Sequence, residues 1–310
     1  MLDFADKTYR YFPPKPNPFV RWLASEFSRR RFLPKKDRIL SVEVSGADDL
    51  HRVLKPSDRL LLCPNHPTHS DAQILLEALR QERLTTHIMA AYDVFLRSKV
   101  GAWVMQRCGS FSVDREGTDP SAVKQAIATL SGGDNLTIFP EGNVYLQNDL
   151  VTPFHDGAAL IGLKAAREII GRGRVLLAPI SIKATHRTDV RAGVLERLAK
   201  LAGAMEEKAP EWAQPGEKLR AVGLAALRRN LKMRGIEFPE GKDLAGTIRG
   251  SADAVLKRLE AKIGITAKAD EDLLDRVRKC RRQIHQIRID SARIHDHAAA
   301  ATWADEAMLA

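Results

Sequence analysis

The sequence predicts an α/β fold, with a mixed, mostly parallel sheet flanked by helices and with helical segments before and after it. Three observations support this. Short apolar runs alternate with amphipathic stretches over residues 39–190. Aromatic and basic side chains are mixed in the residues before 39, and the residues after 190 show only helical periodicity. We therefore divide the 310-residue chain into segments 1–38, 39–190 and 191–310. The last segment shows no motif that predicts its role.

The overall composition is that of an ordinary globular protein, with 28% charged and 44% hydrophobic residues. No apolar run approaches the roughly 18 residues that span a bilayer, and the first residues lack a signal-peptide pattern. The three cysteines, Cys63, Cys108 and Cys280, are widely spaced and odd in number. They argue against a disulfide framework and favour a cytoplasmic protein.

Residues 1–38, which we call the N-terminal arm, carry much of the positive charge. The chain has a net charge of +10, and the arm holds ten Lys or Arg against four Asp or Glu, a net of +6. Apolar side chains recur there at helical spacing, just before a basic run: Phe19, Trp22, Leu23 and Phe27. This pattern is typical of a helix that lies in a membrane interface. The alternative is a helix packed on the core with a solvated basic end.

The middle segment alternates strand-like and helix-like patterns. Predicted strands cover residues 39–44, 59–63, 87–90, 110–113, 136–139 and 175–182, and predicted helices cover 71–83, 93–104, 120–131 and 157–170. Strands that alternate with helices imply parallel pairing, with both faces of the sheet covered. The carboxyl ends of such strands meet along one edge, where ligands bind.

A cluster of polar residues follows the predicted strand at 59–63. His66 and Asp71 would point about 140° apart on one helix, so they can meet only if His66 lies in a loop and Asp71 in the first helical turn. Ser70 and Gln73 form a capping-box pattern that would begin a helix at Asp71. Asp71 would then accept a hydrogen bond from one imidazole nitrogen and leave the other as a general base. The alternative is that Asp71 and Ser70 only cap the helix.

Three further segments contain or follow predicted strands and are expected at the same edge of the sheet. They are the run from Gly109 to Arg115, the run Phe139-Pro140-Glu141-Gly142, and an apolar run interrupted by Pro179. We expect Arg115 and Glu141 to lie near His66, since each follows the carboxyl end of a predicted strand and these ends meet along one edge of a parallel sheet. Taken singly, Arg115 is also consistent with a surface ion pair and Glu141 with a turn.

The order and spacing of these motifs resemble the glycerolipid acyltransferase family, whose best-known members are bacterial 1-acylglycerol-3-phosphate acyltransferases. The resemblance covers roughly residues 55–185. Four ordered motifs carry it: Asn65-His66 to Asp71 (His-x4-Asp), Gly109 to Arg115, Phe139 to Gly142 with Phe154 to Ala158 downstream, and an apolar strand containing Pro179.

The resemblance implies transfer of a fatty acyl group from acyl-CoA or an acyl carrier protein to a lysophospholipid-like hydroxyl in phospholipid biosynthesis. His66 would be the base and Asp71 would orient it, while Arg115, Glu141 and Gly142 would bind the acceptor or its phosphate. The other motif residues would be structural: Asn65, Gly109, Phe139, Pro140 and Pro179. No metal and no bound cofactor is required.

One position departs from the family pattern. The third motif usually continues with an arginine, but Val144 stands there in this chain. Either another cation replaces it, with Lys164 and Arg187 as candidates, or the acceptor is less charged than a phosphomonoester. We expect weaker discrimination for 1-acylglycerol-3-phosphate than the family usually shows.

Other interpretations of the motifs give different functions. His66, His69 and Asp71 together resemble part of a metal-dependent hydrolase site. Cys63 is a possible thiol nucleophile, although a Cys ending an apolar strand is more often a buried small side chain. His69 and His155 are alternative bases. The positive charge favours an anionic membrane surface on the cytoplasmic side over nucleic acid, because no nucleic-acid signature is present.

Overall fold

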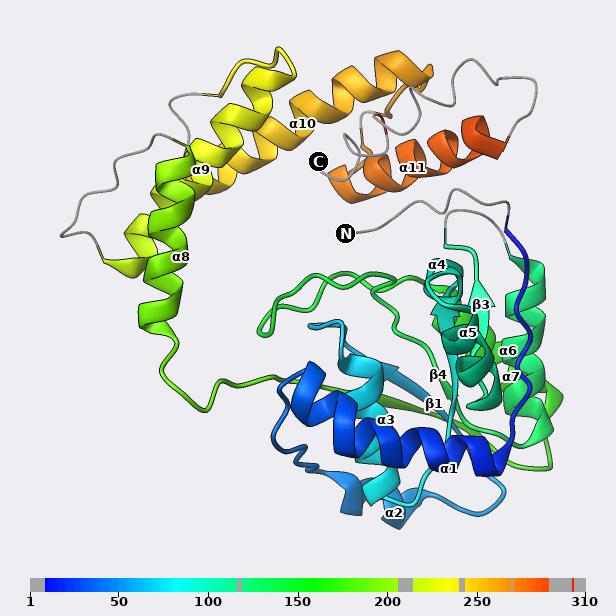
Figure 1. The fold of residues 1–310 in the computed structure, drawn as a ribbon. Helices are drawn as coiled ribbons and strands as arrows, with labels where there is room; N and C mark the ends of the chain where they lie inside the picture. Colours follow the sequence, from blue (N-terminus) through cyan, green and yellow to red (C-terminus); the bar gives the residue numbers. More distant parts are fainter. Residues whose placement is uncertain are drawn as a thin grey trace. The chain divides into compact units, whose positions relative to one another are not determined.

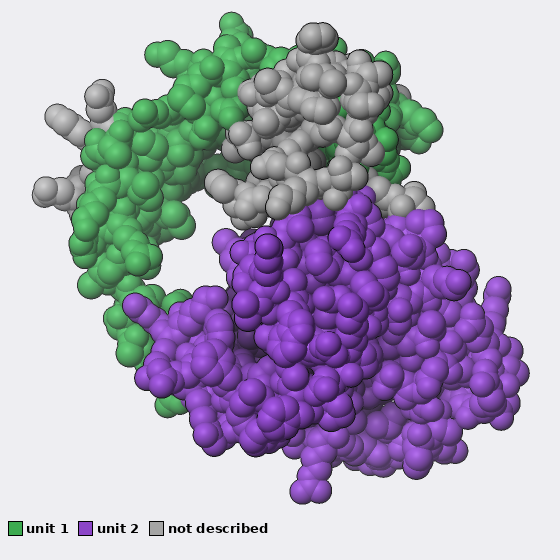
Figure 2. Space-filling view, turned by 45° about the vertical axis from the view of Figure 1, so that its right-hand side comes forward, with its two compact units in different colours: residues 1–4, 185–310 green, residues 5–184 purple. Residues whose placement is uncertain are grey.

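The structure is a computed structural model that describes residues 9–115, 119–205, 214–239, 243–268, 270–289 and 303. The chain divides into two compact units, residues 5–184 and residues 1–4 with 185–310, which Figure 2 colours separately. We describe each unit by itself. Among the described residues, no helix is both long enough and apolar enough to cross a bilayer.

A five-stranded parallel sheet forms the centre of the first unit (Figure 1). The strands are β1 (Arg59–Pro64), β2 (His87–Ala91), β3 (Phe111–Val113), β4 (Leu136–Thr137) and β5 (Val175–Ile180), in the spatial order β3-β2-β4-β1-β5. Each described pair is parallel. The predicted α/β class is confirmed. The strand predicted at 39–44 is wrong, because that run leaves Leu40 exposed and has no strand beside it.

Helices cover both faces of the sheet. They are α2 (Ala47–Val53), α3 (Asp71–Gln81), α4 (Tyr92–Leu96), α5 (Lys99–Arg107), α6 (Pro120–Gly132) and α7 (Gly157–Glu168). On β1, Leu61 packs toward α6 and α7, whereas Leu60 and Leu62 pack toward α3. This alternation is the period of two expected for a strand, and here both faces are apolar because both are buried.

The single helix predicted at 93–104 is two helices. Ser98 lies between α4 and α5 in extended backbone conformation, and its hydroxyl accepts a hydrogen bond from the Gly101 N–H at 3.1 Å. A serine in this position is a good N-cap because its oxygen satisfies a free helical N–H. The apolar periodicity of the sequence continues across Ser98, so the pattern alone does not predict the break between α4 and α5.

The N-terminal arm forms α1 (Pro18–Phe27), which continues as a short π-helix, Ser28–Lys36. Asn17 caps α1 by accepting a hydrogen bond from the Val20 N–H at 3.0 Å. The four apolar residues of the predicted stripe, at positions 19, 22, 23 and 27, are all more than half exposed. The residues before α1 pack on the unit, with the Phe12 ring stacked on Phe95.

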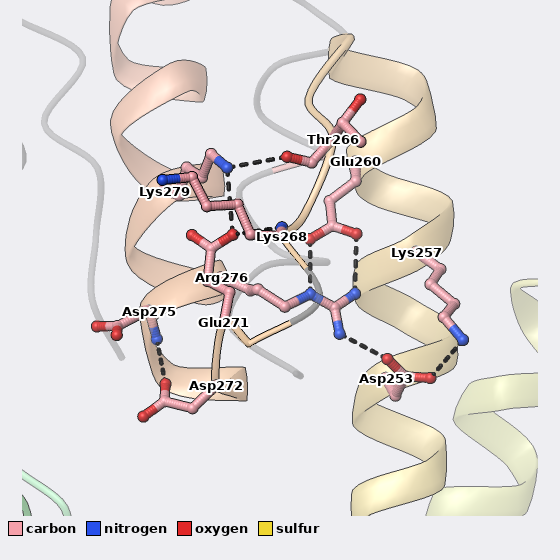
Figure 3. Close-up of polar contacts among 10 residues, drawn as sticks. All are labelled: Asp253, Lys257, Glu260, Thr266, Lys268, Glu271, Asp272, Asp275, Arg276 and Lys279. Atoms are coloured by element: carbon pink, nitrogen blue, oxygen red, sulfur yellow. Dashed lines mark hydrogen bonds and ion pairs between the residues drawn. The ribbon is translucent and has the colours of Figure 1, made fainter.

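Four helices make up the described part of residues 185–310, as predicted: α8 (Arg191–Ala204), α9 (Pro215–Met233), α10 (Leu244–Ile263) and α11 (Leu273–Ile289). Leu256 and Leu259 of α10 pack on Cys280 and Ile284 of α11. Beside this apolar contact, Arg276 of α11 binds two carboxylates of α10 (Figure 3).

Candidate active site

The turn after β1 brings His66 and Asp71 together. The imidazole Nδ1 lies 2.7 Å from Asp71 Oδ2, with Asp71 fully buried and the His66 side chain 20% exposed. His66 lies in the loop, and Asp71 is the first residue of α3. An ionised carboxylate only accepts, so Nδ1 carries the proton and Nε2 of the neutral ring is the free acceptor. This is the arrangement of a general base and its orienting acid.

Thr68 holds the Asp71 carboxylate in place. Its backbone N–H donates to Oδ2 at 2.9 Å and its hydroxyl donates to Oδ1 at 2.6 Å. The predicted capping box is wrong. Ser70 occupies the N-cap position, but its side chain makes no capping hydrogen bond, and its own N–H donates to the Thr68 hydroxyl. Sequence reasoning missed Thr68, although a Thr just before a helix often bonds locally in this way.

Glu141 meets the same loop from the end of β4. It is buried, and its Oε1 accepts a hydrogen bond from the His66 backbone N–H at 2.8 Å, while Oε2 accepts one from the Thr152 hydroxyl at 2.5 Å. The Phe139 ring stacks on the imidazole with the ring centroids 4.2 Å apart. Motifs one and three therefore converge on His66. Glu141 is thus placed to position His66 through its backbone N–H.

Arg115 reaches the turn that follows Glu141. Its Nη1 donates to the Gly142 carbonyl at 2.9 Å and its Nη2 pairs with Asp93 at 3.2 Å. Asp93 lies in the first turn of α4, just after β2, and offsets part of the arginine charge. Sequence reasoning missed Asp93, since its only signal is that it follows a predicted strand in the same sheet.

Two motif glycines are required for conformational and steric reasons. Gly142 has φ +70°, and a Cβ there would lie 2.7 Å from His155 Nε2. Gly109 has φ +93°, and a Cβ would meet the Arg21 guanidinium at 2.9 Å. The left-handed region favours glycine at both positions. Gly109 precedes β3, so it lies at the amino ends of the strands, away from His66.

Asn65 and Pro179 secure the end of β1. The Asn65 side chain exchanges two hydrogen bonds with the Ile182 backbone, accepting at 2.6 Å and donating at 3.1 Å. This amide pair extends the contact between β1 and β5 beyond the strands and fixes the loop that carries His66. Pro179 lies opposite Cys63 on β5, an edge strand, where a residue without an N–H is tolerated.

The side chains of the alternative interpretations lie in less favourable surroundings. Burial raises the pKa of the Cys63 thiol to about 11, which disfavours a thiolate nucleophile. His69 is exposed in the loop. Within the described part of the chain, no three His, Cys, Asp or Glu side chains are grouped to hold a metal ion. The metallohydrolase interpretation therefore lacks a ligand set there.

Comparison with known proteins gives two matches to this chain. Residues 41–183 match the family model described as Acyltransferase. A 1-acyl-sn-glycerol-3-phosphate acyltransferase from Bacillus subtilis (strain 168) is 29% identical over 137 residues, covering 40% of this chain and 67% of that protein. No solved structure matches the chain. Residues 41–183 therefore match an acyltransferase domain, and the two findings together support the glycerolipid acyltransferase family.

Proposed function

We propose that the protein transfers a fatty acyl group from an acyl thioester, carried by CoA or acyl carrier protein, to a hydroxyl of a lysophospholipid-like acceptor. The observation that supports this most is the 2.7 Å contact between His66 and Asp71 at the carboxyl edge of an acyltransferase-family sheet. Acyl transfer to a hydroxyl needs a base that can remove the hydroxyl proton, and this pair supplies one.

The proposed reaction follows from the orientation of the imidazole. His66 Nε2 takes the proton of the acceptor hydroxyl, and the oxygen attacks the thioester carbonyl. The tetrahedral intermediate collapses with cleavage of the C–S bond, and the imidazolium returns the proton to the thiolate that leaves. Asp71 stays ionised and stabilises the imidazolium. A positioned general base contributes typically about 10²–10⁴-fold to such a step.

Arg115 is the proposed contact for the acceptor head group. A phosphomonoester carries close to two negative charges near neutral pH, and arginine binds such groups with two parallel hydrogen bonds. Here Asp93 already pairs with Arg115, and Val144 stands where relatives usually place a second arginine. Of the candidate substitutes, Lys164 lies exposed on α7. We therefore propose an acceptor site that discriminates weakly for the phosphomonoester.

The test of the reaction is lipid mass spectrometry. The full chain is incubated with palmitoyl-CoA, or with palmitoyl carried on acyl carrier protein, and a panel of lyso-acceptors with phosphomonoester, phosphodiester and neutral head groups. We expect an acceptor product heavier by one palmitoyl group, and no such product with the matched His66→Ala variant. Release of free fatty acid that EDTA abolishes, with no acylated acceptor, would instead favour the metal-dependent hydrolase.

We further propose that the enzyme works peripherally on the cytoplasmic face of an anionic membrane. The support is α1, where the stripe of Phe19, Trp22, Leu23 and Phe27 is exposed and a basic run follows. The protein should sediment with vesicles rich in phosphatidylglycerol and be released as salt is raised, because screening weakens the attraction. Removing the charges of Arg29, Arg30 and Arg31 should weaken binding. Equal binding to neutral vesicles would contradict the proposal.

A further inference from the structure

The segment between the Gly142 turn and α7, residues 143–156, forms a long excursion from the sheet (Figure 1); we call it the apolar loop. Its large apolar side chains are exposed rather than buried, with relative exposures of 37 to 69%. They are Tyr145, Leu146, Leu150, Val151 and Phe154. A cluster of exposed apolar side chains on one short segment marks a surface that contacts something other than water.

The polar groups of the apolar loop hold it against the rest of the unit. Asn148 exchanges hydrogen bonds with the Ala184 backbone at 2.5 and 2.9 Å, and Asp149 pairs with Lys183 at 2.6 Å. Thr152 donates to Glu141. These contacts tie the polar side chains of the loop to the chain just beyond β5 and to the active site, while the apolar ones remain exposed.

The backbone adds an independent sign of function. Leu146, the most exposed of the five, has φ +53°. A leucine in the left-handed region is an outlier, and such conformations cluster at functional sites where the surroundings maintain them. The strain at Leu146 is not compensated by burial of its side chain.

The position of the loop points to a lipid surface. Thr152 donates a hydrogen bond to Glu141, which accepts one from the His66 backbone, so the apolar loop is joined to the loop that carries the proposed catalytic base. An acceptor hydroxyl of a membrane lipid lies at head-group depth, and this edge of the sheet must approach the bilayer to reach it. The most exposed side chains, Leu146 and Leu150, are 69% and 62% exposed, which suits insertion into a bilayer.

We infer that the apolar loop inserts into the head-group region of the membrane and brings His66 to the acceptor hydroxyl. This inference rests on the proposed acyl transfer to a lipid acceptor. It adds a second membrane contact, next to the chemistry and separate in sequence from α1.

Insertion is measured independently of catalysis by a depth-sensitive label. An environment-sensitive fluorophore is attached to the cysteine of the Leu150→Cys variant. Cys108 is replaced by Ser so that the label does not react there, and the remaining cysteines, Cys63 and Cys280, are buried. The control label replaces Ile170, which is also apolar and is 76% exposed, against 62% for Leu150, but lies beyond the opposite end of α7. With phosphatidylglycerol vesicles containing spin-labelled lipid, we expect blue-shifted, quenched emission at 150 and water-like emission at 170. Water-like emission at 150 from vesicle-bound protein, or a failure of the protein to bind vesicles, would overturn the inference.

Catalysis supplies the second readout. Leu146→Ser/Leu150→Ser is compared with Ile170→Ser on a long-chain acceptor embedded in vesicles and on a short-chain acceptor dispersed in water. We divide kcat/KM on the embedded long-chain acceptor by kcat/KM on the dispersed short-chain acceptor. This ratio should fall by about tenfold or more in Leu146→Ser/Leu150→Ser, because the variant transfers less apolar surface to lipid, and should stay constant in Ile170→Ser. A loss that is equal on both acceptors would overturn the membrane role. If wild type acylates neither acceptor, the proposed function fails, and the label at 150 still decides whether the loop inserts.

Discussion

Asp71 and Glu260 are both buried carboxylates, but their partners suit them to different tasks. Asp71 binds the His66 imidazole and two donors of Thr68, which leaves the second ring nitrogen available. Glu260 accepts two hydrogen bonds at 2.8 Å from the fork of Arg276, whose remaining nitrogen binds Asp253 (Figure 3). The hydrogen bonds that Arg276 donates to Glu260 raise the pKa of the guanidinium, so Arg276 stays charged. Burial alone does not mark a catalytic carboxylate; a partner that can exchange a proton does.

The first unit shows the same contrast between buried carboxylates at the two ends of strand β1. At the amino end of β1, Asp58 is buried and accepts hydrogen bonds from Arg174 at 3.1 and 2.6 Å. At the carboxyl end of the same strand, Asp71 pairs with a histidine. The arginine pair joins chain segments that flank β1 and β5, whereas the histidine pair lies where ligands bind in parallel sheets.

The largest effect should come from breaking the histidine pair. His66→Ala should lower the transfer rate by about 10²–10⁴-fold or more, because the proton acceptor is lost. Cys63→Ala is the matched control beside it and should stay within a few-fold of wild type, since its thiol is protonated and buried. Steady-state rates with palmitoyl-CoA measure both. Full activity in His66→Ala would contradict the mechanism, and a folded but inactive Cys63→Ala would favour an acyl-enzyme.

Breaking the arginine cluster should affect stability and leave the transfer chemistry in place. Arg276→Met leaves Glu260 buried without its cation, which costs about 3–5 kcal/mol in comparable sites. Hydrogen exchange of the α10 and α11 amides should become faster. The double variant Arg276→Met/Glu260→Leu should recover most of the protection, because no unpaired charge remains. Unchanged exchange in Arg276→Met would show that the cluster contributes nothing to the stability of this helix pair.

The acceptor preference tests the charge balance around Arg115. Val144→Arg should shift preference toward the phosphomonoester by roughly ten- to a hundredfold, the equivalent of about 1.5–3 kcal/mol for one charge-assisted hydrogen bond. Competition between lysophosphatidic acid and a phosphodiester acceptor measures the shift. The proposal is wrong if wild type already uses only lysophosphatidic acid and the variant behaves identically.

A smaller effect is expected at low pH. Hydrogen bonds from Arg174 hold the pKa of Asp58 at about 2, below its ordinary value of 3.8. The unfolded chain therefore binds more protons between these values, and the stabilisation by Asp58 is lost as pH falls through them. Asp58→Asn should flatten the pH dependence of unfolding from about pH 4 to 2. An acid-unfolding curve that keeps its wild-type shape would rule this out.

Local patterns in the sequence were enough to predict the five strands to within two residues at each end, and the helix that begins at Asp71. The contacts that complete the site were not predictable in this way. Glu141 reaches the His66 backbone across 75 residues of chain, and Asp93 pairs with Arg115 from another strand end. Such partners depend on strand order in the sheet. The failure at 39–44 has the same origin, because an apolar run becomes a strand only where a neighbouring strand accepts it.

The central claim, that His66 and Asp71 act as one unit, is tested most directly by a double-mutant cycle. Transfer rates are measured for His66→Ala, Asp71→Asn and the double variant with a water-dispersed acceptor. Residues that act together give strongly non-additive losses. We predict that each single variant is severely impaired and that the transfer rate of the double variant is within a few-fold of that of His66→Ala. Full activity in Asp71→Asn, or losses that multiply in the double variant, would contradict the account.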